Sequence, residues 1–90
     1  MSTVVLDIGA DVGALVLYTP DAMDGWEIEI SRAGEKRTHS QVHRRDTGHY
    51  AAVYPGLAAG EYTIWHRDDD LAVTTATITG GNVTHCRWPS

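Results

Sequence analysis

The side chains best suited to chemistry are histidines, and three of the five lie close together, at His39, His43 and His49. Imidazole is a common metal ligand, and its charge changes near neutral pH. On a strand, His39 and His43 would lie about 13 Å apart, which is too far for one ion. If residues 44–48 form a hairpin loop, His43 and His49 face each other with Cβ atoms about 5 Å apart. Such a pair could share a metal, although two solvated surface imidazoles are the simpler interpretation.

Charge is unevenly distributed along the chain. The 90 residues carry a net charge of −5, yet residues 1–30 hold six acidic side chains and no Lys or Arg. A net acidic chain argues against general nucleic-acid binding, which needs a basic surface. The segment 31–50 is basic and carries Arg32, Lys36, Arg37, Arg44 and Arg45. This asymmetry favours contact with an acidic surface, which could be the first third of another copy. Protection of an exposed sheet edge is the simpler alternative.

The elements that position these residues are strands. Apolar and polar residues alternate with period two, and no stretch of ten or more residues has helical periodicity. We expect strands at residues 4–8, 14–19, 26–30, 37–43, 49–54, 62–66, 71–79 and 83–88. The apolar segment 14–19 is typical of a central strand, and the charged segment 37–45 of a sheet edge. Seven or eight short, mostly antiparallel strands predict an all-β sandwich in one domain, residues 1–90.

Turns complete this prediction. We expect residues 55–60 to form a turn, and Gly80 and Gly81 to form a hairpin that pairs 83–88 with 71–79. In the strand at 71–79, Ala72, Ala76 and Ile78 should face inward.

The segment from Tyr50 to Ile64 resembles a signature of prealbumin-like sandwiches, which have an Ig-like architecture. The signature is aromatic-x-x-Leu-x-x-Gly-x-Tyr-Thr-aliphatic, with Leu57, Gly60 and Tyr62 at its central positions. It is found in carboxypeptidase regulatory-like domains and in collagen-adhesin B-type repeats. The resemblance implies that Leu57 closes one end of the sandwich, and it implies little about activity. More loosely, the whole chain resembles short actinobacterial proteins of uncertain function.

Other reactive residues give weaker signals. The chain lacks the nucleophile elbow of serine hydrolases, the zinc-protease helix motif and a phosphate-binding glycine loop. We expect Cys86 to be a small core residue and His66 to be hydrogen-bonded at a strand end. Trp65 is either an outward-facing contact residue or buried by a neighbouring segment. No basic leader and no apolar run of about 20 residues is visible, which favours a cytoplasmic protein without membrane contact.

These observations predict a small, non-catalytic binding or assembly module without a cofactor. It would use the edge strand at 37–45 and its hairpin, because an exposed edge recruits another strand through main-chain pairing. The partner would be another protein or a second copy, giving a homodimer paired through an edge strand. Metal binding through His43 and His49 is the alternative, and a small hydrolase is a remote one. The predicted partner-binding residues are Arg37, His39, Gln41, His43, Arg44, Arg45, His49 and Trp65.

Overall fold

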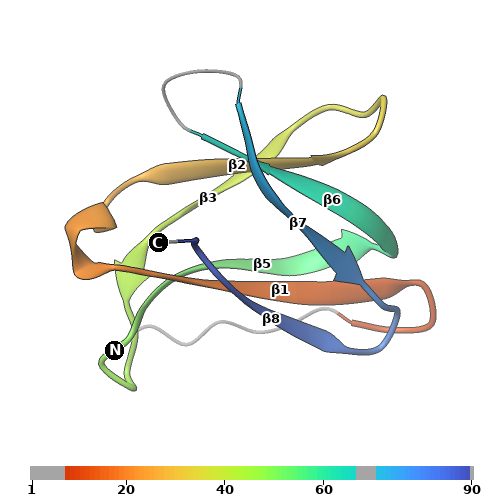
Figure 1. Ribbon diagram of the computed structural model, residues 1–90. Helices are drawn as coiled ribbons and strands as arrows, with labels where there is room; N and C mark the ends of the chain where they lie inside the picture. Colours follow the sequence, from red (N-terminus) through yellow and green to blue (C-terminus); the bar gives the residue numbers. More distant parts are fainter. Residues whose placement is uncertain (1–7, 67–70, 90) are drawn as a thin grey trace.

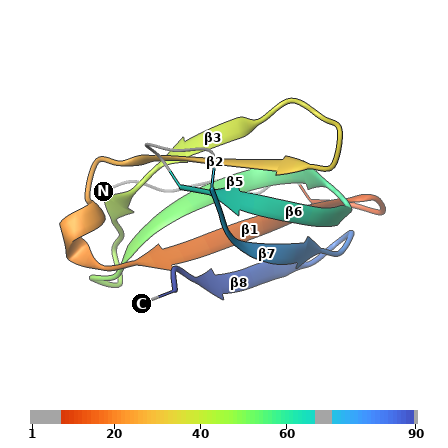
Figure 2. The ribbon, with the colours of Figure 1, turned by 45° about the horizontal axis from the view of Figure 1, so that its top comes forward.

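The computed structural model describes residues 8–66 and 71–89, which form a sandwich of two four-stranded sheets (Figures 1 and 2). The strands are β1 (Val12–Thr19), β2 (Glu27–Arg32), β3 (Thr38–Gln41), β4 (His43–Arg44), β5 (Tyr50–Ala58), β6 (Gly60–Trp65), β7 (Ala72–Ile78) and β8 (Val83–Arg87). Sheet A has the order β4-β5-β1-β8, and sheet B has the order β3-β2-β6-β7. One short 3-10 helix, η1 (Asp21–Met23), follows β1. The predicted all-β sandwich is confirmed.

The hydrophobic core lies between the sheets and is built from alternate residues of the strands. Leu15 and Leu17 of β1, Ile28 and Ile30 of β2, and Ile64 of β6 are fully buried. Burying an aliphatic side chain of this size stabilises the fold by about 1.5–3 kcal/mol. The two glutamates of β2 alternate with its isoleucines and are exposed, as period-two alternation predicts. The apolar strand β1 is central in its sheet, between β5 and β8.

A hydrogen bond from Tyr54 connects the two sheets through the core. Tyr54 belongs to β5 of sheet A, and its hydroxyl donates to the carbonyl oxygen of Ile28 in sheet B at 2.6 Å. The side chain is almost fully buried. Burial raises the pKa of the Tyr54 hydroxyl far above its usual range, and the nearby negative charge of Glu29 acts in the same direction.

The predicted edge strand at 37–45 is divided between the sheets. β3 pairs with β2 in sheet B, whereas β4 pairs with β5 in sheet A. The chain crosses at Val42, whose side chain is fully buried and whose amide donates to the carbonyl of Trp26 at 2.8 Å. Val42 is the apolar residue of this segment, and its burial directs the backbone from one sheet to the other. The predicted edge position holds for both pieces, because each is the outermost strand of its sheet.

The predicted pairing of the last strand with its predecessor is wrong. β8 lies in sheet A and pairs with β1 in parallel, while β7 pairs with β6 in sheet B. The turn at Gly80 and Gly81 therefore carries the chain across the sandwich. Both strands contribute to one core from opposite sides, with Ile78 buried on β7 and Cys86 packed against the core from β8. A hydrogen bond from the Thr84 hydroxyl to the Thr77 carbonyl, 2.8 Å long, links the two edges.

The predicted turn at 55–60 is also shorter than expected, because β5 continues through Pro55 to Ala58. Proline is tolerated there because β4 pairs only with Tyr50 and Ala51, leaving that side of β5 without a ladder partner at Pro55. Leu57 is buried, as the resemblance implies. Gly60 has a φ of 147°, and a Cβ at this position would approach the Arg32 side chain to 2.8 Å.

Two further predictions concern single elements. Ala72 is exposed rather than inward-facing, because the register between β6 and β7 shifts between Ile64 and Trp65. Ala76 and Ile78 are buried as predicted. The predicted strand at residues 4–8 lies outside the described residues, apart from Ile8, which is exposed and not part of a strand.

The Tyr54 hydrogen bond yields a stability prediction. Tyr54→Phe should lower the free energy of unfolding by about 0.5–1.5 kcal/mol at pH 7, because the buried hydrogen bond from the Tyr54 hydroxyl to the Ile28 carbonyl is lost. Tyr50→Phe is the matched control, since the Tyr50 hydroxyl makes no hydrogen bond within the described residues. Urea unfolding of both variants measures the difference. Equal stability of the two variants would contradict the role given to Tyr54.

The same group has a pH dependence with a defined sign. Because its pKa is raised in the folded protein, Tyr54 retains its proton in the folded state while the unfolded chain ionises above pH about 10. Its contribution is therefore complete below that pH and is lost as the pH rises further. Wild type should lose stability above pH 10 more steeply than Tyr54→Phe. Burial also raises the pKa of Tyr62. Because Tyr62 is present in both proteins, both should still lose some stability as the pH rises above about 10.

Candidate functional site

The eight predicted partner-binding residues do not form one surface. Four of them lie on sheet B or beside its outer face, namely Arg37, His39, Gln41 and Trp65. The other four belong to the β4–β5 hairpin of sheet A, namely His43, Arg44, Arg45 and His49. The crossing at Val42 separates the two groups.

The sheet B group is held largely by internal contacts. Arg37 forms an ion pair with Glu29 at 3.0 Å, and its guanidinium lies 4.1 Å above the centre of the Trp65 ring. Trp65 is half-buried, and its indole N–H donates to the Ser31 hydroxyl at 3.0 Å. Trp65 was expected to be either an outward-facing contact residue or a residue buried by a neighbouring segment. The second alternative fits better, because Arg37 covers its ring. Gln41 donates its side-chain amide to the carbonyl of Gly25 at 3.1 Å.

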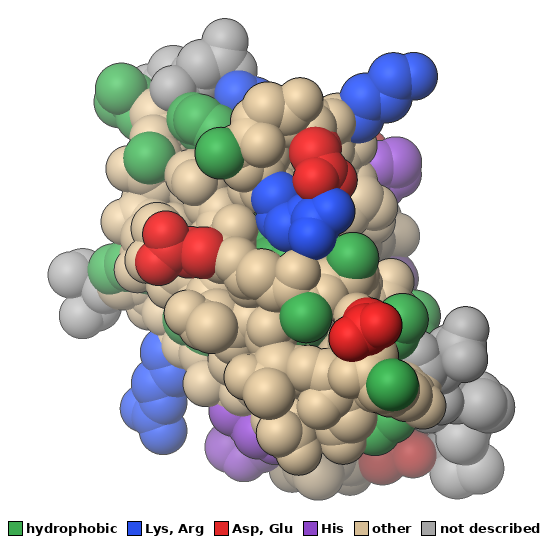
Figure 3. Space-filling model, turned by 90° about the vertical axis from the view of Figure 1, so that its right-hand side faces the viewer, with side chains coloured by type: hydrophobic (Ala, Val, Ile, Leu, Met, Phe, Trp, Pro, Cys, Tyr) green, Lys and Arg blue, Asp and Glu red, His purple; other side chains and the backbone are tan. Residues whose placement is uncertain are grey.

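Acidic partners also reduce the basic character of this part of the chain. The imidazole of His39 lies 3.7 Å from the Glu27 carboxylate, and Arg32 pairs with Glu35. Figure 3 shows acidic and basic side chains next to one another at the end of the molecule that holds the β2–β3 turn, with histidines only at the margins of the view. No large surface of a single sign is visible there.

In the hairpin, the predicted pairing of His43 with His49 is wrong. His43 pairs with Ala51 and Arg44 with Tyr50, and the Arg45 amide donates to the His49 carbonyl at 2.7 Å. The turn spans residues 46–48, two residues fewer than the expected loop of 44–48, and Gly48 adopts a φ of +88° in it, which permits the tighter turn. The two histidines are diagonal neighbours, so their Cβ atoms lie farther apart than those of a directly opposed pair. The described part of the chain contains no group of three or more His, Cys, Asp or Glu side chains that could hold a metal ion.

Within the hairpin, Arg45 has a structural role. Its Nε and Nη2 atoms donate to the Ala51 carbonyl at 3.1 and 2.8 Å, and Nη2 also reaches the Gln41 carbonyl at 3.5 Å. Burial lowers the pKa of this guanidinium. By contrast, His43, Arg44 and His49 are exposed and form no ion pair in residues 8–66 and 71–89.

A cluster around Tyr18 occupies the outer face of sheet A. The ring of Tyr18 lies between two imidazoles, with His49 edge-on at 5.9 Å and His85 stacked at 5.8 Å between ring centres. The Tyr18 hydroxyl is hydrogen-bonded to Nδ1 of His85 at 3.0 Å. The parallel pairing of β1 and β8 places Arg87 directly beside Tyr18. Trp88 continues this pairing, because its amide donates to the Tyr18 carbonyl at 2.8 Å.

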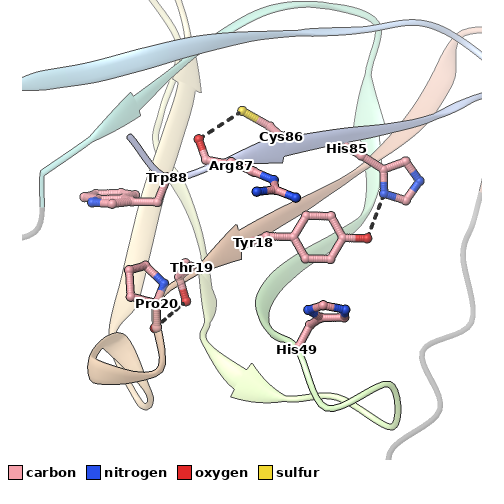
Figure 4. A pocket seen from close by; sticks show the side chains of 8 residues that line it. All are labelled: Tyr18, Thr19, Pro20, His49, His85, Cys86, Arg87 and Trp88. Atoms are coloured by element: carbon pink, nitrogen blue, oxygen red, sulfur yellow. Dashed lines mark hydrogen bonds between the residues drawn. The ribbon is translucent and has the colours of Figure 1, made fainter. Parts of the chain in front are cut away.

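These residues border a cavity of about 730 Å³ at the end of β1 and β8 (Figure 4). The figure shows His85 and Arg87 on one side of Tyr18, His49 on the other, and Trp88 with Pro20 at the far end. The cavity is open to solvent and lies within the size range of small-molecule sites.

Reasoning from sequence missed this cluster except for His49. Tyr18, His85 and Arg87 each occupy an outward position of an alternating strand, and that signal was available. Their proximity depends on the parallel pairing of β1 with β8, which the hairpin prediction excluded. Cys86 points to the opposite side of β8, where it is half-buried and packs against the core as predicted.

Comparisons with protein-family models, with curated proteins and with solved structures find no match to this chain. The prealbumin-like resemblance therefore stays a prediction. Among the described residues, no helix has the length and apolar character needed to cross a membrane.

The Tyr18–His85 hydrogen bond predicts one tautomer of His85. A neutral phenol donates to the unprotonated ring nitrogen, so neutral His85 should carry its proton on Nε2. Nitrogen chemical shifts of the imidazole above pH 8 distinguish the two tautomers. In Tyr18→Phe this preference should weaken, whereas the His43 ring should not change. An Nδ1-protonated ring in wild type would contradict the assignment.

Proposed function

We propose that this chain is a small binding or assembly module that docks an acidic protein surface through its β4–β5 hairpin. The carrying observation is that His43, Arg44 and His49 are exposed on this hairpin and form no ion pair within the described residues. We call these three residues the hairpin surface. The guanidinium of Arg44 is a permanent cation and remains available to a negative partner, and the two imidazoles add polar groups beside it. Complementary charge mainly determines specificity and the rate of encounter.

The distribution of charge between the sheets supports this proposal. No strand of sheet A contains Asp or Glu, whereas sheet B contains Glu27 and Glu29 on β2 and Glu61 on β6. Asp46, in the turn between β4 and β5, is the acidic residue nearest in sequence to the hairpin surface. An acidic partner therefore meets little repulsion from the strands beneath. A second copy that presents Glu61 of its sheet B, which forms no ion pair within the described residues, is one such partner.

Side chains, rather than main-chain strand addition, are the means of docking that we favour. β4 has two residues and β3 has four, and the crossing at Val42 interrupts the edge between them. Very short edge strands oppose edge-to-edge pairing. The earlier expectation of a homodimer paired through this edge is thus replaced by contact through charged side chains.

The hydrogen bonds of the serine hydroxyl groups among the described residues also favour a binding role over a hydrolase. Ser40 donates its hydroxyl to the Val53 carbonyl at 2.7 Å, and Ser31 accepts the indole N–H of Trp65. Both hydroxyls are committed to structural hydrogen bonds, which does not favour a nucleophilic role.

Binding to a short polyglutamate peptide tests the proposal. Affinity measured by calorimetry should fall with added salt, because exposed charges are screened. Arg44→Glu should reduce affinity at least about tenfold at low salt, since it replaces attraction with repulsion. Lys36→Glu is the control, because it makes the same charge change in the β2–β3 turn, outside the hairpin surface, and should have a smaller effect.

Equal losses in the two variants would mean that net charge alone governs binding, and the proposal would then be wrong. Light scattering at low and high salt shows whether a second copy is the partner. If the partner is a second copy, the chain should associate with itself at low salt. This association should weaken at high salt and in Arg44→Glu.

A further inference from the structure

The cavity beside Tyr18 differs chemically from the hairpin surface. We propose that it binds a small aromatic carboxylate, with Arg87 holding the carboxylate and the aromatic side chains contacting the ring. This inference goes beyond protein docking and does not depend on it, because the anion-binding group is Arg87 of β8, which is not part of the hairpin surface, although His49 borders both.

Arg87 supplies the anion-binding group. It is exposed, borders the cavity and forms no ion pair within the described residues. The β1–β8 register holds its backbone beside Tyr18, so that the guanidinium projects from the same face as the Tyr18 ring. A guanidinium is planar and donates two parallel hydrogen bonds to a carboxylate, and this geometry favours a flat anion.

The aromatic character of the lining selects the rest of the ligand. Tyr18, His49, His85 and Trp88 all border the cavity, and Trp88 is half-buried against the core, which holds its ring in place. Offset stacking or edge-to-face contact with an aromatic ligand contributes about 0.5–1.5 kcal/mol per ring pair beyond area burial. The ring of a bound ligand can therefore be recognised without a further polar group.

The charge of the lining also limits the ligand. None of the residues that line the cavity is Asp or Glu, and Arg87 is the permanent cation among them. One fixed positive charge matches a monoanion such as a carboxylate. The hydroxyl of Tyr18 is already bonded to His85, which leaves Nε2 of His85 and the His49 ring to contact the edge of the ligand.

Titration with benzoate, followed by nuclear magnetic resonance of the whole chain, tests the inference. Saturable shifts are expected at the Arg87 Nε and Trp88 Nε1 signals, and not at the Trp65 indole on sheet B. Arg87→Gln should weaken benzoate binding about tenfold or more, as expected for a charge-assisted hydrogen bond. Lys36→Gln is the control. It also removes one positive charge, but Lys36 lies in the β2–β3 turn and does not line the cavity, so the affinity for benzoate should be unchanged.

Ligand analogues keep the test decisive if Arg87→Gln is poorly folded. Benzamide has the ring without the charge and should bind wild type about tenfold more weakly than benzoate. Acetate has the charge without the ring and should bind more weakly as well. Equal affinity for benzoate and benzamide, or shifts that map away from Arg87 and Trp88, would overturn the proposal. Because these probes are small molecules, failure here leaves the polyglutamate result unaffected.

Discussion

The arrangement of the candidate sites depends on the burial of Leu15 and Leu17 in the central strand of sheet A. Side chains alternate along a strand, so burial of these two leucines directs Val16 and Tyr18 to the outer face. The neighbours of β1 then determine what surrounds Tyr18. His49 comes from the residue just before antiparallel β5, and parallel β8 contributes His85 and Arg87. Residues far apart in sequence therefore meet around one tyrosine.

A second constraint acts at Val42, where burial of one apolar side chain takes the chain from sheet B to sheet A. The basic middle of the sequence is thereby divided into two groups with different surroundings. Arg37 pairs with a glutamate and covers Trp65, whereas Arg44 remains free of ion pairs within the described residues. The charge asymmetry of the sequence is real, but within the described residues Arg32 and Arg37 are paired with glutamates, whereas Lys36 in the β2–β3 turn and Arg44 on the hairpin form no ion pair.

Local patterns in the sequence located most of the strands and most of the core, but not the division of the segment 37–45 or the length of β5. Ile28 and Ile30 alternate with glutamates and are buried, and Leu57, which the prealbumin-like resemblance assigns to the end of the sandwich, is buried too. Pairing between strands could not be predicted in this way, because it depends on contacts between distant segments. Gly80 and Gly81 indicate a turn equally well whether the chain returns along the same sheet or crosses to the other.

The candidate site illustrates the same limit. The spacing of His43 and His49 allowed a directly opposed pair, but the left-handed conformation of Gly48 shortened the loop and shifted the register. Tyr18 and Arg87 each looked unremarkable in sequence, and only the parallel pairing of β1 with β8 brings them together.

The most direct test of this account is therefore the pairing of β8, measured by nuclear Overhauser contacts in solution. The account predicts contacts between the Trp88 amide and Tyr18, and between the Tyr18 ring and the rings of both His49 and His85. A regular ladder of contacts between β8 and β7, with none between β8 and β1, would contradict it.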